Sequence, residues 1–389
     1  MSNTLTSLIP TIYEALDVVS REQLGFIPAV TRNSSAERAA LNQSILVPIA
    51  PQGTLADNTP AVTAPNTGDQ TIGNVSMTIS KSKHYPVRWN GEEQRGAINA
   101  GWYNQLLTNQ FAQAFRTLSN QIEADLAVTA YQGASRAYGT AGTTPFGVAG
   151  DLSDAAMLRQ ILDDNGAPQT DLQLVLNSAA VANMRGKQTI LLKVNESGSA
   201  AMLRSGSISD VPLEGFSLHN SGQLSVVTKG TGAGYVTSGA TAAGVNGIAL
   251  VTGTGTVNAG DVVTYAADAA NKYVVNAGVT APGTITIGAP GAQILIPTAN
   301  AMTIGNSYRP SVGFSKSAIQ LITRVPQMPI GPDGKAMDMA DDVMSITDPI
   351  SGITYEIAVY RQFMQLVYHV RLAWGAQAVK SNHIATLLG

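Results

Sequence analysis

The chain has 389 residues, a net charge of −3 and no cysteine. This length predicts a large core divided into two or more domains, and the absence of cysteine excludes disulfides, thiol nucleophiles and thiolate metal sites. The small negative charge excludes a global basic field that would attract nucleic acid. No apolar run approaches the ~20 residues that span a bilayer, and no signal-peptide pattern opens the chain, so we expect a soluble product.

Residues 1–27 predict one short amphipathic helix. Pro10 suits a first helical turn, and Ile12, Leu16 and Val19 fall on one side of the helix. Two interpretations remain open at this point. The helix packs on its own chain, or it belongs to an N-terminal arm, residues 1–44, that lies on a neighbouring molecule.

Residues 45–95 predict an extended excursion flanked by strands. The segment 45–50 is a short strand that contains Pro48, and residues 51–74 are rich in Pro, Gly, Asn and Thr. Strand alternation resumes at 75–80 and continues through 81–89. Because a two-stranded ribbon alone is marginally stable in water, a projecting ribbon needs something to lie against, such as another subunit.

A group of charged and aromatic residues stands at the base of this ribbon. One hypothesis makes these residues contacts between subunits. The alternative is a solvated surface, where each charge contributes little, and this is the commoner case for any single residue. The candidate contacts are Arg88, Trp89, Glu92, Glu93 and Arg95.

The longest helical signal runs from about residue 98 to 133. No proline interrupts it, and Gly133 is a natural C-terminal stop. At a rise of ~1.5 Å per residue the helix would be roughly 50 Å long, which suits a spine that carries other elements. Its apolar face is formed by Leu107, Phe111, Phe115, Leu118, Ile122 and Leu126.

Helix and strand signals then alternate up to about residue 224. A small-residue loop at 133–150 precedes a helix at 153–165, for which Ser153 is a plausible N-cap. A strand at 172–176, a helix at 178–184, a flexible loop at 198–206 and a strand at 215–218 follow. This alternation predicts a mixed α+β domain.

The composition changes near residue 228. From Gly230 to Tyr308 only Asp261, Asp268 and Lys272 are charged. Short β-rich pieces separated by glycine predict a small all-β module of sandwich or barrel type, inserted between halves of the α+β domain. The predicted strands are 248–252, 262–266, 273–275, 284–287 and 294–296.

The last segment, residues 309–389, returns to the kind of sequence that precedes the β-rich module. We expect strands at 319–322, 343–346, 354–359 and 364–370, the last of which suits the centre of a sheet. Residues 329–334 (PIGPDG) form a turn cluster.

The residues offer no catalytic constellation. The four histidines, which are scattered along the chain, show no metal-binding spacing on one helix, and no Gly-x-Ser-x-Gly nucleophile elbow is present. The glycine-rich run at 230–234 lacks the lysine of a phosphate loop, and the carboxylates at 337–342 lack calcium-loop spacing. We therefore expect no enzymatic activity, no cofactor and no metal site.

The collinear order of these parts resembles the major coat proteins of tailed bacteriophages, and in particular the Salmonella podovirus coat family. The resemblance covers almost the whole chain. It rests on Val47-Pro48 before the loop, on Gln113, Ala114, Asn120, Glu123 and Ala127 in the long helix, on Gly215-Phe216 and Leu224 to Lys229 before the insertion, on Asn258 to Val263 within it, on Phe314 to Ile322 after it, and on Gly375, Ala378, Lys380 and Ile384 near the end.

The resemblance implies a Hong Kong 97-like α+β fold with an inserted β-barrel. Its parts would be an N-terminal arm (1–44), an extended loop with flanking strands (45–95), a peripheral domain with the spine helix (96–149), an axial domain in two parts (150–224 and 306–389) and the inserted barrel (225–305). Two departures stand out: Lys380-Ser381-Asn382 replaces the usual Arg-Pro-Glu of the family, and the insertion is short and nearly uncharged.

The function implied is that of a major capsid protein. Many copies, as pentamers and hexamers, would close into an icosahedral shell around double-stranded DNA without sequence-specific binding or membrane contact. The resemblance also implies a scaffolding protein and a portal as partners, assembly in the bacterial cytoplasm and a final place in the virion. The low charge density agrees, since interface cores are depleted in charge. The alternatives are another self-assembling phage protein, such as a tail tube or decoration protein, and a β-rich hydrolase.

Overall fold

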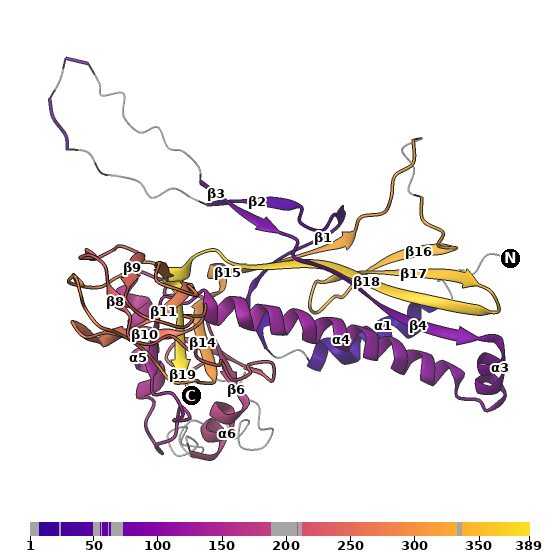
Figure 1. Ribbon diagram of the computed structural model, residues 1–389. Coiled ribbons are helices and arrows are strands. Elements are labelled where there is room, and N and C mark those ends of the chain that lie inside the picture. Colours follow the sequence, from indigo (N-terminus) through magenta and orange to yellow (C-terminus); the bar gives the residue numbers. More distant parts are fainter. Residues whose placement is uncertain are drawn as a thin grey trace.

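A 30-residue helix lies beneath a twisted sheet, with a second sheet at one end and a ribbon that rises from the body (Figure 1). The computed structural model describes residues 8–22, 25–49, 55, 57–60, 62–63, 73–187, 208, 212–332 and 337–389. Most of the predicted loop at 51–74, and the predicted loop at 198–206, lie outside the described residues. The α+β class predicted from the sequence is confirmed.

The long helix, α4 (Tyr103–Gln132), ends where the sequence predicts but begins five residues later. The predicted first turn belongs instead to a separate helix, α3 (Gly91–Asn99), and Gly101 between them has a φ of +80° that no α-helix continues through. At the C-terminal end, a Cβ on Gly133 would lie 2.4 Å from the Cβ of Ala378, so this glycine allows the helix end to approach the sheet.

The apolar face of α4 is buried, as its spacing predicts. Phe111 and Phe115 are both 0% exposed. Each ring meets a tyrosine edge-on: Phe111 with Tyr368 at 5.6 Å between ring centroids, and Phe115 with Tyr355 at 5.0 Å. Both tyrosines belong to the sheet above the helix, so the stripe is an intramolecular core stripe.

This sheet has six strands, and the longest organises it. β18 (Gln365–Ala378) pairs along one edge with β4 (Lys81–Asn90). Along its other edge the first half pairs with β17 (Thr354–Gln362) and the second half with β15 (Ile319–Pro326). The outer strands are β16 (Asp342–Thr347) and β1 (Thr31–Ala39), the latter parallel to β15.

Alternation along β18 assigns its two faces. Tyr368, Val370, Leu372 and Trp374 are buried in the same apolar core as α4, whereas His369 and Arg371 lie between them in sequence and face the other side. The strand β1 was not predicted. Its sequence, TRNSSAERA, is polar and lacks strand propensity, so only its pairing with β15 makes it a strand.

The N-terminal segment packs on its own chain. Helix α1 (Ile9–Glu22) places Ile12, Leu16 and Val19 in the core shared with α4, and the short helix α2 (Phe26–Ala29) follows. Of the two interpretations of this helix, the packed helix is confirmed for the single chain. The predicted arm at 1–44 also contains β1, which belongs to the central sheet.

The second sheet begins with five strands around the C-terminus of the chain. In order they are β7 (Phe216–Ser221), β6 (Leu172–Asn177), β14 (Pro310–Ser315), β19 (Ile384–Leu388) and β5 (Arg136–Gly139). Helices α5 (Ser153–Asp164) and α6 (Ser178–Lys187) bury their apolar sides against it. The N-cap prediction was wrong, because Ser153 is the first helical residue and the cap position is Leu152, which has no side-chain hydrogen bond.

The predicted β-module forms a small, nearly closed barrel. Its strands are β8 (Val236–Thr237), β9 (Gly247–Val251), β10 (Val262–Tyr265), β11 (Asp268–Ala277), β12 (Thr284–Ile287) and β13 (Met302–Ile304). Antiparallel pairing runs β8–β9–β12–β11–β10–β13, and a bridge between Val236 and Ala301 returns from β13 to β8. The predicted strand at 294–296 was wrong: only Ile296 makes a bridge, to Thr241.

The barrel has its own apolar core and is also joined to the body. Tyr235, Ile248, Val263 and Ile285 are among the buried residues of that core. However, β11 pairs with β5 at two positions, so the barrel strands continue the second sheet. The predicted boundary at 225–305 therefore encloses a separate core but not a separate sheet.

The ribbon consists of β2 (Ser44–Ile49) and β3 (Gly73–Thr78), which pair with each other in antiparallel register. Met77 and Ile79 anchor its base against Ile322 and Ala373 of the six-stranded sheet. Beyond this base the ribbon leaves the body (Figure 1). Among the described residues, no helix combines the length and apolar character that a membrane crossing needs.

Candidate assembly interface

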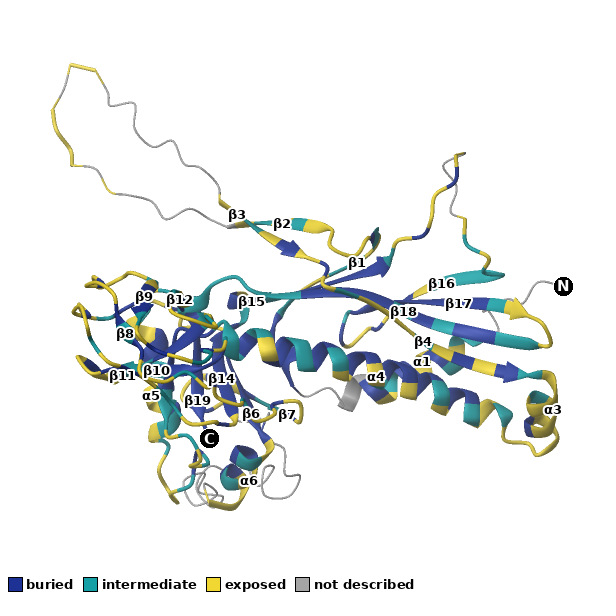
Figure 2. Cartoon of the chain, viewed as in Figure 1, coloured by how far each residue is buried: buried dark blue, intermediate teal, exposed yellow. Residues whose placement is uncertain are grey.

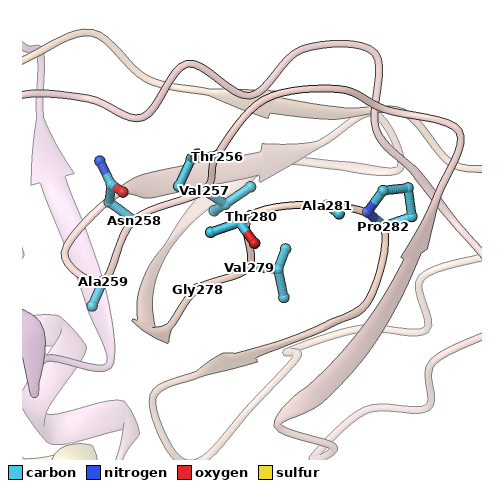
Figure 3. Close-up of a pocket in the computed structure, with 9 residues that line it drawn as sticks. All are labelled: Thr256, Val257, Asn258, Ala259, Gly278, Val279, Thr280, Ala281 and Pro282. Atoms are coloured by element: carbon cyan, nitrogen blue, oxygen red, sulfur yellow. The ribbon is translucent and has the colours of Figure 1, made fainter.

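One cavity carries little chemistry. It is an open hollow of about 530 Å³ in the barrel (Figure 3). No charged or aromatic side chain lines it. Its walls are Thr256, Val257, Asn258, Ala259, Gly278, Val279, Thr280, Ala281 and Pro282. This hollow offers neither a general base nor an activated nucleophile.

The fold brings together two histidines that the sequence separates. His84 on β4 and His369 on β18 stack with ring centroids 4.6 Å apart. Burial lowers the pKa of His369, and His84 and Arg371 lower it further. Among the described residues, no group of three or more His, Asp or Glu side chains has a metal-binding arrangement. We therefore assign this pair no metal.

Exposed apolar residues lie instead in α3, just before α4 and in the β17–β18 turn. These segments are at the α3 end of the molecule (Figure 1), where much of the chain is exposed (Figure 2). The β17–β18 turn consists of Phe363 and Met364, which are 89% and 71% exposed. A two-residue hairpin turn favours Asn-Gly, because its backbone needs positive φ. Here Met364 has a φ of +54°, and its carbonyl accepts a 3.4 Å hydrogen bond from the Gly91 N–H of α3. Two exposed apolar side chains thus occupy a turn whose geometry does not require them.

A groove of about 480 Å³ lies between β4, α3 and α4. It is lined by Arg88, Trp89, Glu93, Gly96, Ala97, Trp102, Leu106 and Gln110. Trp102 is 49% exposed and Ile98 is 54% exposed. We define the end patch as Ile98, Trp102, Phe363 and Met364 together with the rim charges Arg88, Glu92, Glu93 and Arg95.

The five predicted contact residues have different surroundings. Arg88, Glu92, Glu93 and Arg95 are exposed, and none of them makes an ion pair with another described residue. Glu93 already has a local role, because its carboxylate accepts from the Asn90 N–H while the Asn90 side chain accepts from the Glu93 N–H, a capping box.

The fifth residue, Trp89, is a core residue. It is 6% exposed, and its Nε1 donates a 2.9 Å hydrogen bond to Gln110 Oε1 of α4. Its ring also meets Tyr103 edge-on at 5.3 Å. Trp89 therefore lines the groove from inside, whereas the exposed apolar residues of the end patch face solvent. The sequence did not identify these exposed residues. The apolar dipeptide in a tight turn was the signal that could have identified them.

The ribbon offers a second, different surface at another part of the molecule. Leu46 on β2 is 63% exposed, and Leu55 and Val62, beyond the ribbon, are fully exposed. Within the described residues, β2 and β3 pair only with each other, so each strand presents one edge of unpaired backbone groups. Both properties favour contact with another chain.

No protein-family model matches the chain, and no curated protein matches it. Several solved structures resemble it. The capsid structure of cyanophage P-SCSP1u gives a TM-score of 0.47 at 11% identity, over 92% of this chain and 86% of that chain. A structure from Mycobacterium phage Che8 gives 0.43 at 15% identity, over 94% and 91%.

A virus-like particle from Pyrococcus furiosus gives 0.43 at 10% identity, over 97% of this chain and 98% of that chain. TM-scores below 0.5 at such low identity do not assign a function. Evidence for the function must therefore come from the surfaces of this molecule itself.

Proposed function

We propose that this chain is a major capsid protein of a tailed bacteriophage, which assembles from many copies into a closed icosahedral shell. One observation carries the proposal: the molecule presents two unlike exposed surfaces, the end patch and the projecting ribbon. Unlike surfaces on one chain make head-to-tail contacts, and these contacts generate rings or larger lattices, whereas a two-fold dimer uses one surface against itself.

Each surface suits contact with another copy. The end patch combines four exposed apolar side chains with two positive and two negative rim charges, so its electrostatics neither repel a second copy nor demand a charged partner of one sign. The ribbon has a base anchored in the body, and beyond that base its two strands pair only with each other among the described residues. Such a ribbon is marginal unless a neighbour supports it.

The resemblance in sequence favours one kind of lattice among those that head-to-tail contacts can form. It supports a Hong Kong 97-like shell protein, akin to the Salmonella podovirus coat family, with the barrel at 225–305 as the insertion. Residues 45–95 would then be the extended loop, 96–149 the peripheral domain, and 150–224 with 306–389 the axial domain. A scaffolding protein, a portal and packaged DNA would be the partners, and the role would be structural, in the virion.

Imaging tests this proposal. The purified full-length chain is examined by negative-stain electron microscopy and sedimentation, alone and with a scaffolding protein, beside the variant Phe363→Asp. Closed shells from the wild type and soluble monomers from the variant would support the proposal. Tubes or filaments would favour the tail-tube alternative, because head-to-tail contacts that do not close give open assemblies.

A matched control separates assembly from folding. Val245→Asp changes another exposed apolar residue, 43% exposed, which precedes β9 of the barrel and belongs to neither surface. It should assemble like the wild type. If Phe363→Asp also assembles normally, the end patch is not an interface, and a wild type that stays monomeric under all these conditions contradicts the proposed function itself.

A further inference from the structure

Glu123 is a buried carboxylate on the side of α4 that meets the N-terminal segment. Its side chain is 7% exposed. The Phe26 N–H donates to both of its oxygens, at 2.7 and 2.8 Å, and the Ile27 N–H donates to Oε2 at 3.1 Å. These contacts join segments 96 and 97 residues apart in sequence, so they fasten α2 to the spine helix.

The close approach depends on Gly25. A Cβ at this position would lie 1.8 Å from Glu123 Oε1 and 3.0 Å from the Ser221 Cβ. Any other residue would therefore push the carboxylate away from the Phe26 and Ile27 N–H groups.

A cavity of about 200 Å³ lies beside this carboxylate. It is lined by Val19, Gly25, Arg116, Ser119, Asn120, Glu123, Asn220, Ser221, Gly222 and Gln223. Asn220 Oδ1 is buried and accepts no hydrogen bond from the described residues. An unused acceptor beside a buried carboxyl group is suited to receive a proton-bearing oxygen.

We propose that Glu123 is a proton-linked latch that holds the described part of the N-terminal segment, residues 9–22 and 25–30, on α4. In the docked state the neutral carboxyl group accepts from the Phe26 and Ile27 N–H groups and donates its own proton to Asn220 Oδ1. When the proton is lost, a charge without an ion-pair partner among the described residues remains buried, and the segment loosens.

Few described residues bring charge to the latch. Arg116, two turns earlier on α4, is the charged side chain that shares the cavity, and its charge favours the ionised form of Glu123, against the effect of burial. The described residues of α2 and of the turn after β7 bring none, and α1 contributes Val19. Burial outweighs the two backbone hydrogen bonds and raises the pKa of Glu123 from its ordinary 4.5 to about 7.

The direction of the pH dependence follows from linkage. Because the pKa is higher in the docked state than in water, docking binds a proton. The stabilisation is fully present below the ordinary pKa and is lost as pH rises through about 7. Between about pH 5.5 and about pH 8.5 the docking equilibrium should fall by roughly 30-fold for a shift of this size.

Hydrogen–deuterium exchange on the soluble, unassembled full-length chain tests the latch. Protection of peptides within residues 9–30, corrected for intrinsic exchange, should fall by roughly 30-fold over that pH range in the wild type. Glu123→Gln should remain protected throughout, because its amide supplies the same acceptor and a donor for Asn220 Oδ1. Glu14→Gln, which neutralises an exposed carboxylate of α1, should behave like the wild type.

Two results would overturn the proposal: a wild-type protection that does not change with pH, or a Glu123→Gln chain that loosens as the wild type does. If Glu123→Gln fails to fold, Asn220→Ala provides the second arm. Loss of the proton's acceptor should move the midpoint of loosening to lower pH, and an unchanged midpoint contradicts the latch. The readout needs no assembly, so it is independent of the proposed capsid function.

Discussion

Truncation of Phe115 tests whether α4 is a spine of its own subunit. Phe115 is 0% exposed and lies 5.0 Å from Tyr355, centroid to centroid. The Tyr355 hydroxyl is hydrogen-bonded to Ser119 Oγ at 3.1 Å, so the tyrosine is held from both ends and cannot move into a space left by the phenylalanine. Phe→Ala substitutions in cores cost ~3–5 kcal/mol, and we expect the upper half of that range for Phe115→Ala.

Such a loss is large against the roughly 5–15 kcal/mol that stabilises a typical domain, so most of the variant should aggregate when expressed. The assay is soluble yield, followed by urea unfolding of any soluble fraction monitored by tryptophan fluorescence. Gln113→Ala is the matched control on the same helix. Gln113 is exposed, and the hydrogen bonds of its side chain with described residues go to its helix neighbours Thr117 and Arg116, so its substitution should change stability by less than ~0.5 kcal/mol. A Phe115→Ala chain that is soluble with wild-type unfolding would refute the assignment of this stripe to the core.

Three further predictions concern packing. Asp125 accepts hydrogen bonds from Trp374 Nε1 at 2.8 Å and from Lys81 Nζ at 2.5 Å. Asp125→Ala should lower the free energy of urea unfolding by about 1–3 kcal/mol, because the buried indole N–H would lose its acceptor. A loss under ~0.5 kcal/mol would contradict this. Gly375→Ala should lower the melting temperature markedly, since the new Cβ would lie 2.1 Å from the Thr78 carbonyl oxygen. Gly352 has a positive φ and open space where a Cβ would lie, so Gly352→Asn should leave the melting temperature nearly unchanged. The fragment 225–305 should give a dispersed β-type amide spectrum, because it has its own apolar core; a collapsed spectrum would show that pairing with β5 is needed for folding.

Periodic signals predicted their elements well. The four- and three-residue spacing along α4 identified its buried face, including Phe111 and Phe115, because one continuous helix presents one continuous stripe to the core. Alternation gave β3 and β4, and strand-forming residues gave β17 and the first half of β18, but β19 was not predicted. The loss of charge after residue 228 correctly marked a separate β-rich core.

The proposed end patch contains four of the five contact residues named from the sequence. Charged residues at the ribbon base were visible as a group, but the sequence could not show that Trp89 is turned inward against Gln110. Nor could it show that Phe363 and Met364 occupy a tight turn, since an apolar dipeptide before a strand is equally compatible with the strand itself.

The sequence alone thus determined the elements whose residues repeat with the period of a helix or strand, because local periodicity depends on neighbours a few positions away. Tertiary structure alone decided the rest. The polar strand β1 exists through its pairing with β15, the His84–His369 stack through the register of β4 on β18, and the burial of Glu123 through contact with α2. Each of these joins residues 96 or more positions apart, and no local pattern records which distant segment will supply the partner.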